Sequence, residues 1–486
     1  MTVPQPAVAW EPSSPGAFTR AIRLGEWIGE PVTPLFESWL LSTMEERLHA
    51  RLEDWIGQHA PRPYHVVVNG WYFYSVNFLS AAALVRSLPH VLWRLVRDPR
   101  RVAGLIPPLL RHSVPVFERE WRDDLLPRYR AAVTAAEGRV EAMPAQDLPP
   151  LIDELADLAG DYFGSIAALT GAAYKMEINV ARFTRRHLAD ALGGRHLPLL
   201  AGLERPTGPG GHAVASLDWW HPLPSAGTAV AAPVADHSRL VQARQAAEGA
   251  AFGALGSSPR RLRAFRRLLA DAQRLVVVRE EQVRDLTLAW PAMRRAVLRI
   301  GETLVEHGVL AKADDVFFLT RAEALDALDG RPSAVDVAAR RAMRQEQARL
   351  VPPLLVGRSS LMLRKAWDAF PRLLGAVASD TALVSGAPAS GGRATGCVRV
   401  IRGQAEFDDL QAGEILVAPL TAPAWTPLFA RAAAVVTDGG SAASHASIIA
   451  REYGIPAVVG CGDATARLQT GMRVTVDGST GNVEPA

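Results

Sequence analysis

Residues 437–460 of the 486-residue chain read TDGGSAASHASIIAREYGIPAVVG. An apolar segment at 432–436 leads into 438–443, which hold no large side chain, and Ser444 precedes a helix-forming run. Serine at this place is a common N-cap, while Gly454 and Pro456 are typical of a helix end. The sequence predicts a strand, a loop of small residues and a helix that begins at His445.

The predicted position of His445 at the start of a helix suits chemistry with phosphate. A helix N-terminus presents unpaired backbone N–H groups and the positive end of the helix dipole, which favour neutral imidazole and hold a phosphate dianion. A histidine at this place can also pack or cap without any chemistry, and the local pattern alone does not choose. The predicted phosphate loop consists of Gly439, Gly440, Ser441 and Ser444.

The same string resembles the phosphohistidine signature of the PEP-utilising enzyme family. That family includes phosphoenolpyruvate synthase, pyruvate phosphate dikinase and rifampin phosphotransferase. The resemblance implies that His445 is catalytic and that the C-terminal segment is the family's swivelling domain. It continues through residues 396–400, 413–417, 423–429 and 471–483.

Two positions depart from the family pattern. Many members have threonine two residues before the histidine, where this chain has Ala443, and Ala422 stands where an acidic residue is common. These departures concern regulation and fine positioning, and they leave the identity of His445 intact.

The composition predicts a soluble globular protein. Hydrophobic residues make up 49% of the chain, which is sufficient for two or three domain cores. The net charge of +3 comes from scattered arginines, so no basic tract indicates nucleic-acid binding. Cys397 and Cys461 have neither disulfide-framework nor metal-ligand spacing. With no secretory pattern at the N-terminus and no apolar run of membrane-spanning length, we expect a cytoplasmic protein without a metal site.

Residue periodicity divides the chain into two parts. Leucines and other apolar residues recur at helical spacing between about residues 35 and 370, for example at Leu151, Leu155 and Leu158. Short β runs separated by glycine follow after a Gly/Ala/Ser-rich segment. The predicted fold is therefore multidomain, α followed by α/β: a mostly helical acceptor domain at 1–375 and a small phosphohistidine domain at 376–486, with residues 371–396 including a hinge.

The nucleotide-binding half of the family's chemistry has no visible match in these residues. There is no GxxxxGK, and Lys175, Lys312 and Lys365 are the only lysines. The resemblance implies that ATP and Mg²⁺ bind elsewhere. We expect a separate ATP-grasp protein to phosphorylate His445 in trans, with no cofactor bound directly by this chain.

The resemblance also suggests residues for the acceptor site. The segment VVVREEQVRDLTLAW is similar to the family's Arg-Glu helix, so Arg279 and Glu280 are carried over as the pair nearest the transferred phosphate. Arginine would offset phosphoryl charge, and the carboxylate would orient the acceptor hydroxyl or take its proton. Rifampin phosphotransferases have lysine four residues after the arginine, whereas this chain has Val283 followed by Arg284. Arg284 either replaces that lysine or forms an ordinary helix ion pair with Glu280.

A second candidate group lies in GPGGHAVASLDWWHP. Its substrate-binding candidates are His212, Trp219, Trp220 and His221, because aromatic side chains grouped on a loop often line a ligand pocket. The tryptophans can equally anchor the loop on the core.

The leading hypothesis is a phosphohistidine carrier and acceptor-binding component of an ATP-dependent phosphotransferase that acts on a small organic molecule. One alternative is a dehydratase or condensing enzyme that phosphorylates its substrate only transiently. Another is a binding protein that retains His445 for structure alone. Neither nucleic acid nor membrane is an expected partner, and the sequence does not identify the acceptor.

Overall fold

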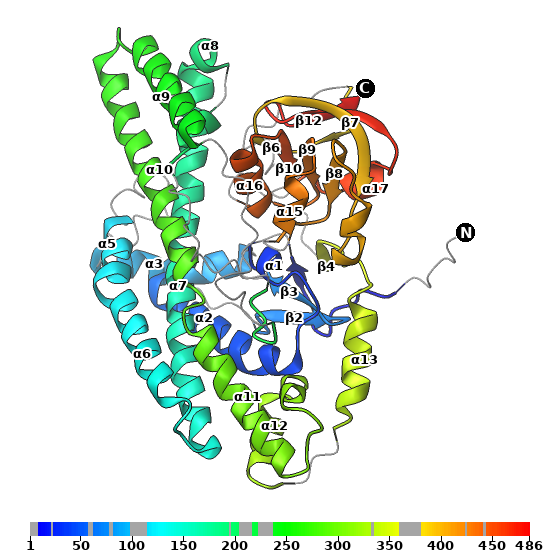
Figure 1. The fold of residues 1–486 in the computed structure, drawn as a ribbon. Coiled ribbons are helices and arrows are strands. Elements are labelled where there is room, and N and C mark those ends of the chain that lie inside the picture. Colours follow the sequence, from blue (N-terminus) through cyan, green and yellow to red (C-terminus); the bar gives the residue numbers. More distant parts are fainter. Residues whose placement is uncertain are drawn as a thin grey trace.

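Figure 1 shows a helical body and a C-terminal α/β unit beside its upper part. The computed structural model describes residues 8–20, 23–56, 62–76, 81–97, 114–193, 196–203, 216–221, 237–331, 335–358, 381–422, 425–440 and 444–486. Below, "helical body" means the described residues from 23 to 347, and "C-terminal unit" means those from 381 to 486.

The helical body is built around α7 (Leu148–His187), a helix of 40 residues that extends about 60 Å. The apolar residues predicted to recur along it face one large core, in which Leu151 and Leu155 are buried. Helices α2 and α10 pack along its sides. The helices around α7 are α1 (Arg23–Trp27), α2 (Ser42–Ile56), α3 (Ala81–Arg97), α5 (Val114–Arg119), α6 (Leu126–Arg139), α8 (Ala189–Leu192), α9 (His237–Ala254), α10 (Pro259–Asp285), α11 (Trp290–Glu306), α12 (Arg321–Leu328) and α13 (Val337–Gln347).

Two local features shape the helical body near its lower end. A capping box between Thr320 and Glu323 opens α12. The apolar residues just before it belong to a 3₁₀ helix, Ala313–Phe318. Within the described ranges, no helix has both the length and the apolar character needed to cross a bilayer.

A small antiparallel sheet lies under the C-terminal unit and was absent from the sequence prediction. Its strand order is β2-β3-β1-β4. Asn69 and Gly70, with φ of 50° and 79°, make the tight turn between β2 and β3. This is the Asn-Gly signature of a two-residue hairpin. The strands are β1 (Ala17–Thr19), β2 (His65–Val68), β3 (Trp71–Ser75) and β4 (Leu355–Gly357).

The C-terminal unit contains an eight-stranded mixed sheet in the order β5-β12-β11-β7-β8-β9-β10-β6. The strands β7, β8, β9 and β10 are parallel to one another, and the remaining pairings are antiparallel. The short β runs that the sequence predicts after the Gly/Ala/Ser-rich segment all form strands. They are β5 (Val384–Ser385), β6 (Ala387–Ser390), β7 (Arg393–Val400), β8 (Ile415–Ala418), β9 (Ala434–Thr437), β10 (Ala457–Val459), β11 (Arg473–Asp477) and β12 (Asn482–Pro485).

The beginning of this sheet corrects part of the predicted hinge. Residues 384–390 and the start of β7 are strands, although their small side chains suggested a linker. Ala387 and Ala389 are buried in one of the cores of the C-terminal unit. The strands β5 and β6 lie at opposite ends of the strand order, yet only Gly386 separates them along the chain. The sheet therefore curls until its two edges meet. Residues 371–380 of the predicted hinge lie outside the described residues.

We expect Tyr129→Phe to destabilise the helical body. The buried Tyr129 hydroxyl donates to the Leu286 carbonyl at 3.0 Å and accepts from the Ala289 N–H at 3.2 Å. Phenylalanine keeps the ring but leaves these backbone groups without the hydroxyl, which should cost about 1–3 kcal/mol of unfolding free energy. Urea unfolding followed by circular dichroism measures the loss. An unchanged midpoint would mean that the hydroxyl contributes nothing to stability.

Candidate functional site

His445 lies at the carboxyl edge of the parallel strands. The chain leaves β9, passes through residues 438–444 and enters α16 (His445–Tyr453). Ser444 is the N-cap as predicted, and its hydroxyl accepts from the Ser447 N–H. Gly454 ends the helix with φ of 65°. Ligands of parallel α/β sheets bind outside the carboxyl ends of the strands, so His445 occupies the edge at which this architecture places its chemistry.

The loop before α16 requires glycine. A Cβ atom on Gly439 would lie 2.6 Å from the Leu420 side chain, and Gly440 has φ of 111°. The backbone is fixed on both sides, because the Gly439 N–H donates to the Pro419 carbonyl at 2.9 Å and the Gly460 N–H donates to the Gly439 carbonyl at 3.3 Å. The small residues therefore let the loop pass closely over β8 and carry His445 to the sheet edge.

The imidazole of His445 is partly exposed and has a hydroxyl group near each nitrogen. Thr421 Oγ1 lies 3.1 Å from Nδ1, and Thr426 Oγ1 lies 3.4 Å from Nε2. The ring also meets Phe429 edge to face, with 5.9 Å between centroids. Thr421 and Thr426 both belong to the connection between β8 and β9, so this neighbouring segment at the same sheet edge orients the imidazole. A histidine fixed in this way can present a lone pair in one direction.

The helical body contacts the start of α16. Glu26 in α1 is buried, and its Oε2 accepts from the backbone N–H of His445 at 3.2 Å. On α7, Ile178 packs against the core that lies under α16. Figure 1 shows α16 on the side of the C-terminal unit that faces α7 and α10. The histidine therefore lies where the C-terminal unit and the helical body meet.

A buried charged group surrounds Glu177, the residue before Ile178. Although burial acts to raise the pKa of Glu177, a hydrogen bond from His196 and the positive charges of Arg451 and Arg279 lower it below the usual glutamate value. His196 Nε2 lies 3.5 Å from Glu177 Oε1. Arg279 is buried at 3% exposure, and Arg451 belongs to the histidine-bearing helix. The predicted Arg279 is thus grouped with an arginine from the other part of the molecule.

The sequence of the C-terminal unit identifies its relatives. Residues 410–481 match the family described as PEP-utilising enzyme, mobile domain. These residues are a mobile domain of the PEP-utilising enzyme family. The predicted resemblance to this family is therefore confirmed for the C-terminal unit, and the matched residues include His445 and both threonines that contact its ring.

Some of the similar proteins carry phosphotransferase names. A protein of Bacillus subtilis named uncharacterized phosphotransferase YvkC is 41% identical over 192 residues, which cover 38% of this chain and 23% of that protein. A rifampicin phosphotransferase of Streptomyces sviceus is 39% identical over 210 residues, 42% of this chain and 23% of the relative. A phosphoenolpyruvate synthase of Aeropyrum pernix is 50% identical over 109 residues, 22% and 13% of the two chains. The chain thus spans less than a quarter of the length of these relatives.

Several predicted site residues fall outside what the structure describes. His212 and Ser441 lie in segments that are not described. Glu280 and Arg284 are in α10, on the same helix as Arg279, but the structure does not describe their side chains. Their roles at the acceptor site therefore remain predictions.

The structure favours the packing interpretation for the tryptophan segment. Trp219 is fully buried and meets Trp39 edge to face with 6.2 Å between centroids. Trp220 lies under the guanidinium of Arg344 at 4.2 Å, and His221 Nε2 lies 3.1 Å from Glu30 Oε2. These side chains are therefore engaged with the helical body and do not form a free aromatic pocket.

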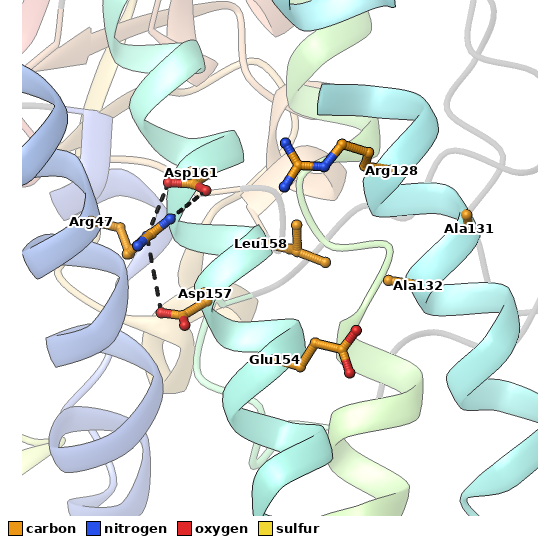
Figure 2. A pocket seen from close by; sticks show the side chains of 8 residues that line it. All are labelled: Arg47, Arg128, Ala131, Ala132, Glu154, Asp157, Leu158 and Asp161. Carbon is orange, nitrogen blue, oxygen red and sulfur yellow. Dashed lines mark hydrogen bonds and ion pairs between the residues drawn. The ribbon is translucent and has the colours of Figure 1, made fainter. Parts of the chain in front are cut away.

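A surface groove between α2, α6 and α7 does not contain any of the predicted site residues. Figure 2 shows Arg47 reaching toward Asp157 and Asp161. The Arg47 Nε and NH2 groups bind the two Asp161 oxygens at 3.0 and 2.6 Å. The groove is lined by Arg47, Arg128, Ala131, Ala132, Glu154, Asp157, Leu158 and Asp161. Three of its charged groups form ion pairs between α2 and α7, because Arg47 contacts both Asp157 and Asp161.

Asp438 should make the stability of the C-terminal unit depend on pH. Burial raises its pKa to about 6, against the opposing hydrogen bonds from Thr465. Because the folded state holds this proton more tightly, the stabilisation is complete below about pH 4 and is lost as the pH rises through 6. Relative to Asp438→Asn, the unfolding free energy of the natural protein should fall by up to about 3 kcal/mol between pH 4 and 7.

Urea unfolding across this pH range, with both proteins measured in parallel, checks the prediction. Asparagine retains an oxygen acceptor for the Thr465 N–H, which donates to Asp438 Oδ1 at 2.8 Å, so the local contacts should survive. Parallel curves for the two proteins would show that Asp438 does not titrate in this window.

Proposed function

We propose that this protein is the phosphohistidine carrier and acceptor-binding component of an ATP-dependent phosphotransferase. His445 receives a phosphoryl group from ATP and passes it to a small organic molecule held by the helical body. ATP and Mg²⁺ are bound by an ATP-grasp protein that acts in trans. The match of the C-terminal unit to the PEP-utilising enzyme family and the phosphotransferase names of some relatives support transfer through phosphohistidine.

The observation that carries this proposal is the setting of the His445 ring. It is partly exposed at the carboxyl edge of the sheet, with hydroxyl groups near both nitrogens and the helical body next to it. When Nδ1–H donates to Thr421 Oγ1, Nε2 carries the lone pair that can attack phosphorus. Thr426 lies beside Nε2, where its hydroxyl can donate to a phosphoryl oxygen once the group is attached.

Both phosphoryl transfers use Nε2 of His445, and in each of them one bond to phosphorus forms while another breaks. In the first, Nε2 attacks the γ-phosphorus and the bond to the ADP oxygen breaks. In the second, an acceptor oxygen attacks that phosphorus, the N–P bond breaks, the electron pair returns to Nε2 and the acceptor proton leaves to a base. Phosphoryl transfer depends mainly on alignment and on neutralising charge, so the protein needs an oriented imidazole and nearby cations. Arg279 is the cation that we assign to the acceptor side.

The first test is phosphorylation of His445. The protein, mixed with [γ-³²P]ATP, Mg²⁺ and a candidate ATP-grasp protein, should acquire an acid-labile and base-stable label. The variant His445→Ala should lose this label completely because no other residue replaces the nucleophilic nitrogen. His307→Ala is a matched control, since this histidine follows α11 in the helical body. Equal labelling of His445→Ala and the natural protein would refute the proposed carrier.

The second test separates the two transfers. We expect Arg279→Gln to accept label on His445 normally but to discharge it to acceptor at least about 100-fold more slowly, because the arginine no longer offsets phosphoryl charge. The assay follows loss of label from the isolated phosphoprotein when a low-molecular-weight metabolite fraction is added. Arg274→Gln, an exposed position on the same helix, is the control. Normal discharge by Arg279→Gln would remove Arg279 from the acceptor site.

A further inference from the structure

The contact between Glu26 and His445 connects distant parts of the chain. Glu26 is 4% exposed, and its carboxylate accepts the backbone N–H of His445 at 3.2 Å across 419 positions of sequence. His445 is the first residue of α16, so this carboxylate lies at the positive end of the helix. A negative side chain of the helical body thus binds the histidine-bearing helix at its first residue.

A second set of contacts supports the same docking. Glu177 on α7 lies within the electrostatic reach of Arg451, which is on α16 and near its other end. Ile178, the next residue on α7, packs against the core of the C-terminal unit. A Cβ atom on Gly29 would contact the Ala422 side chain at 3.6 Å, so the segment after α1 and the loop after β8 are also closely packed. Docking therefore combines the Glu26 hydrogen bond to α16 with apolar packing, and it brings Glu177 within electrostatic reach of Arg451.

The docked arrangement fits an imidazole without a phosphoryl group. A phosphoryl group would add about two negative charges to the ring of the residue whose backbone N–H binds the Glu26 carboxylate. Glu26 is buried, so repulsion between these like charges is weakly screened by water. Phosphorylation therefore opposes the contact that Glu26 makes with the start of α16.

We propose that Glu26 is a positioning residue that holds the mobile domain on the helical body while His445 is unphosphorylated, and that phosphorylation of His445 weakens this docking. The inference rests on the proposed carrier function. It adds regulation: the phosphorylated domain docks productively only when the acceptor site supplies compensating charge, as from Arg279 and a bound acceptor. Phosphohistidine is then kept away from an empty site, where water would consume it.

The test measures docking without ATP or acceptor. Dyes for energy transfer are placed on the exposed Cys397 and on a cysteine at the exposed α6 position created by Thr134→Cys, in a Cys461→Ser background. Potassium phosphoramidate then phosphorylates histidine directly and releases ammonia. In the otherwise natural protein, phosphorylation should lower the docked-to-undocked ratio by at least about tenfold, because the buried Glu26 carboxylate repels the added negative charge. The same treatment of His445→Gln should change nothing.

Glu26→Gln distinguishes this role from simple packing. The variant should be less docked before treatment, because a neutral amide interacts more weakly with the helix end, and it should respond much less to phosphorylation. Glu26→Asp keeps the negative charge, so its docking should still respond to phosphorylation. This variant replaces Glu26→Gln in the test if the glutamine variant does not fold. Glu118→Gln, another buried carboxylate of the helical body, should behave as the natural protein.

Two results would overturn the proposal. One is a docked fraction that phosphorylation of His445 leaves unchanged, and the other is a Glu26→Gln response equal to that of the natural protein. Failure of the carrier function gives a different result: His445 would acquire no label from ATP, whereas the response to phosphoramidate would be unaffected.

Discussion

The N–H groups in the first turn of α16, which the helix itself does not bond, organise the whole site. A helix cannot satisfy its first donors internally. Here Ser444 accepts one of them from within the C-terminal unit, and Glu26 accepts another from the helical body. The same end of the helix thus presents the imidazole, attracts anions and provides the place where two parts of the molecule meet. Chemistry and docking at this site draw on one set of backbone dipoles.

Sheet topology supplies the remaining geometry. Because β8 and β9 are adjacent and parallel, the loops that follow them emerge at one edge. Thr421 comes from the first loop and His445 from the second, so their hydrogen bond does not depend on any long flexible connection. The close passage at Gly439 keeps these loops together. The imidazole is consequently oriented by a rigid frame even though it lies at a surface between two units.

Local sequence signals predicted the part of the site that is local. Ser444, Gly454 and the small residues before His445 mark the helix and its loop, and the β runs of the C-terminal unit alternate clearly with glycine. The hairpin at 65–75 carried an equally local Asn-Gly signal but was overlooked beside the dominant helical periodicity. Glu26 and Thr421 could not be found this way, because their contacts with His445 depend on tertiary packing. For the tryptophan segment, the sequence left a ligand pocket and core packing equally open, because loop composition alone does not reveal burial.

The curled sheet has a consequence for the carrier role that we propose. Strand edges with unpaired backbone groups are templates on which other chains assemble, and a module released into solvent would expose them repeatedly. Here β5 and β6 are neighbours in sequence at Gly386, so the first and last strands of the order are brought together. Under the proposed function, a carrier built in this way can travel between sites with little tendency to aggregate.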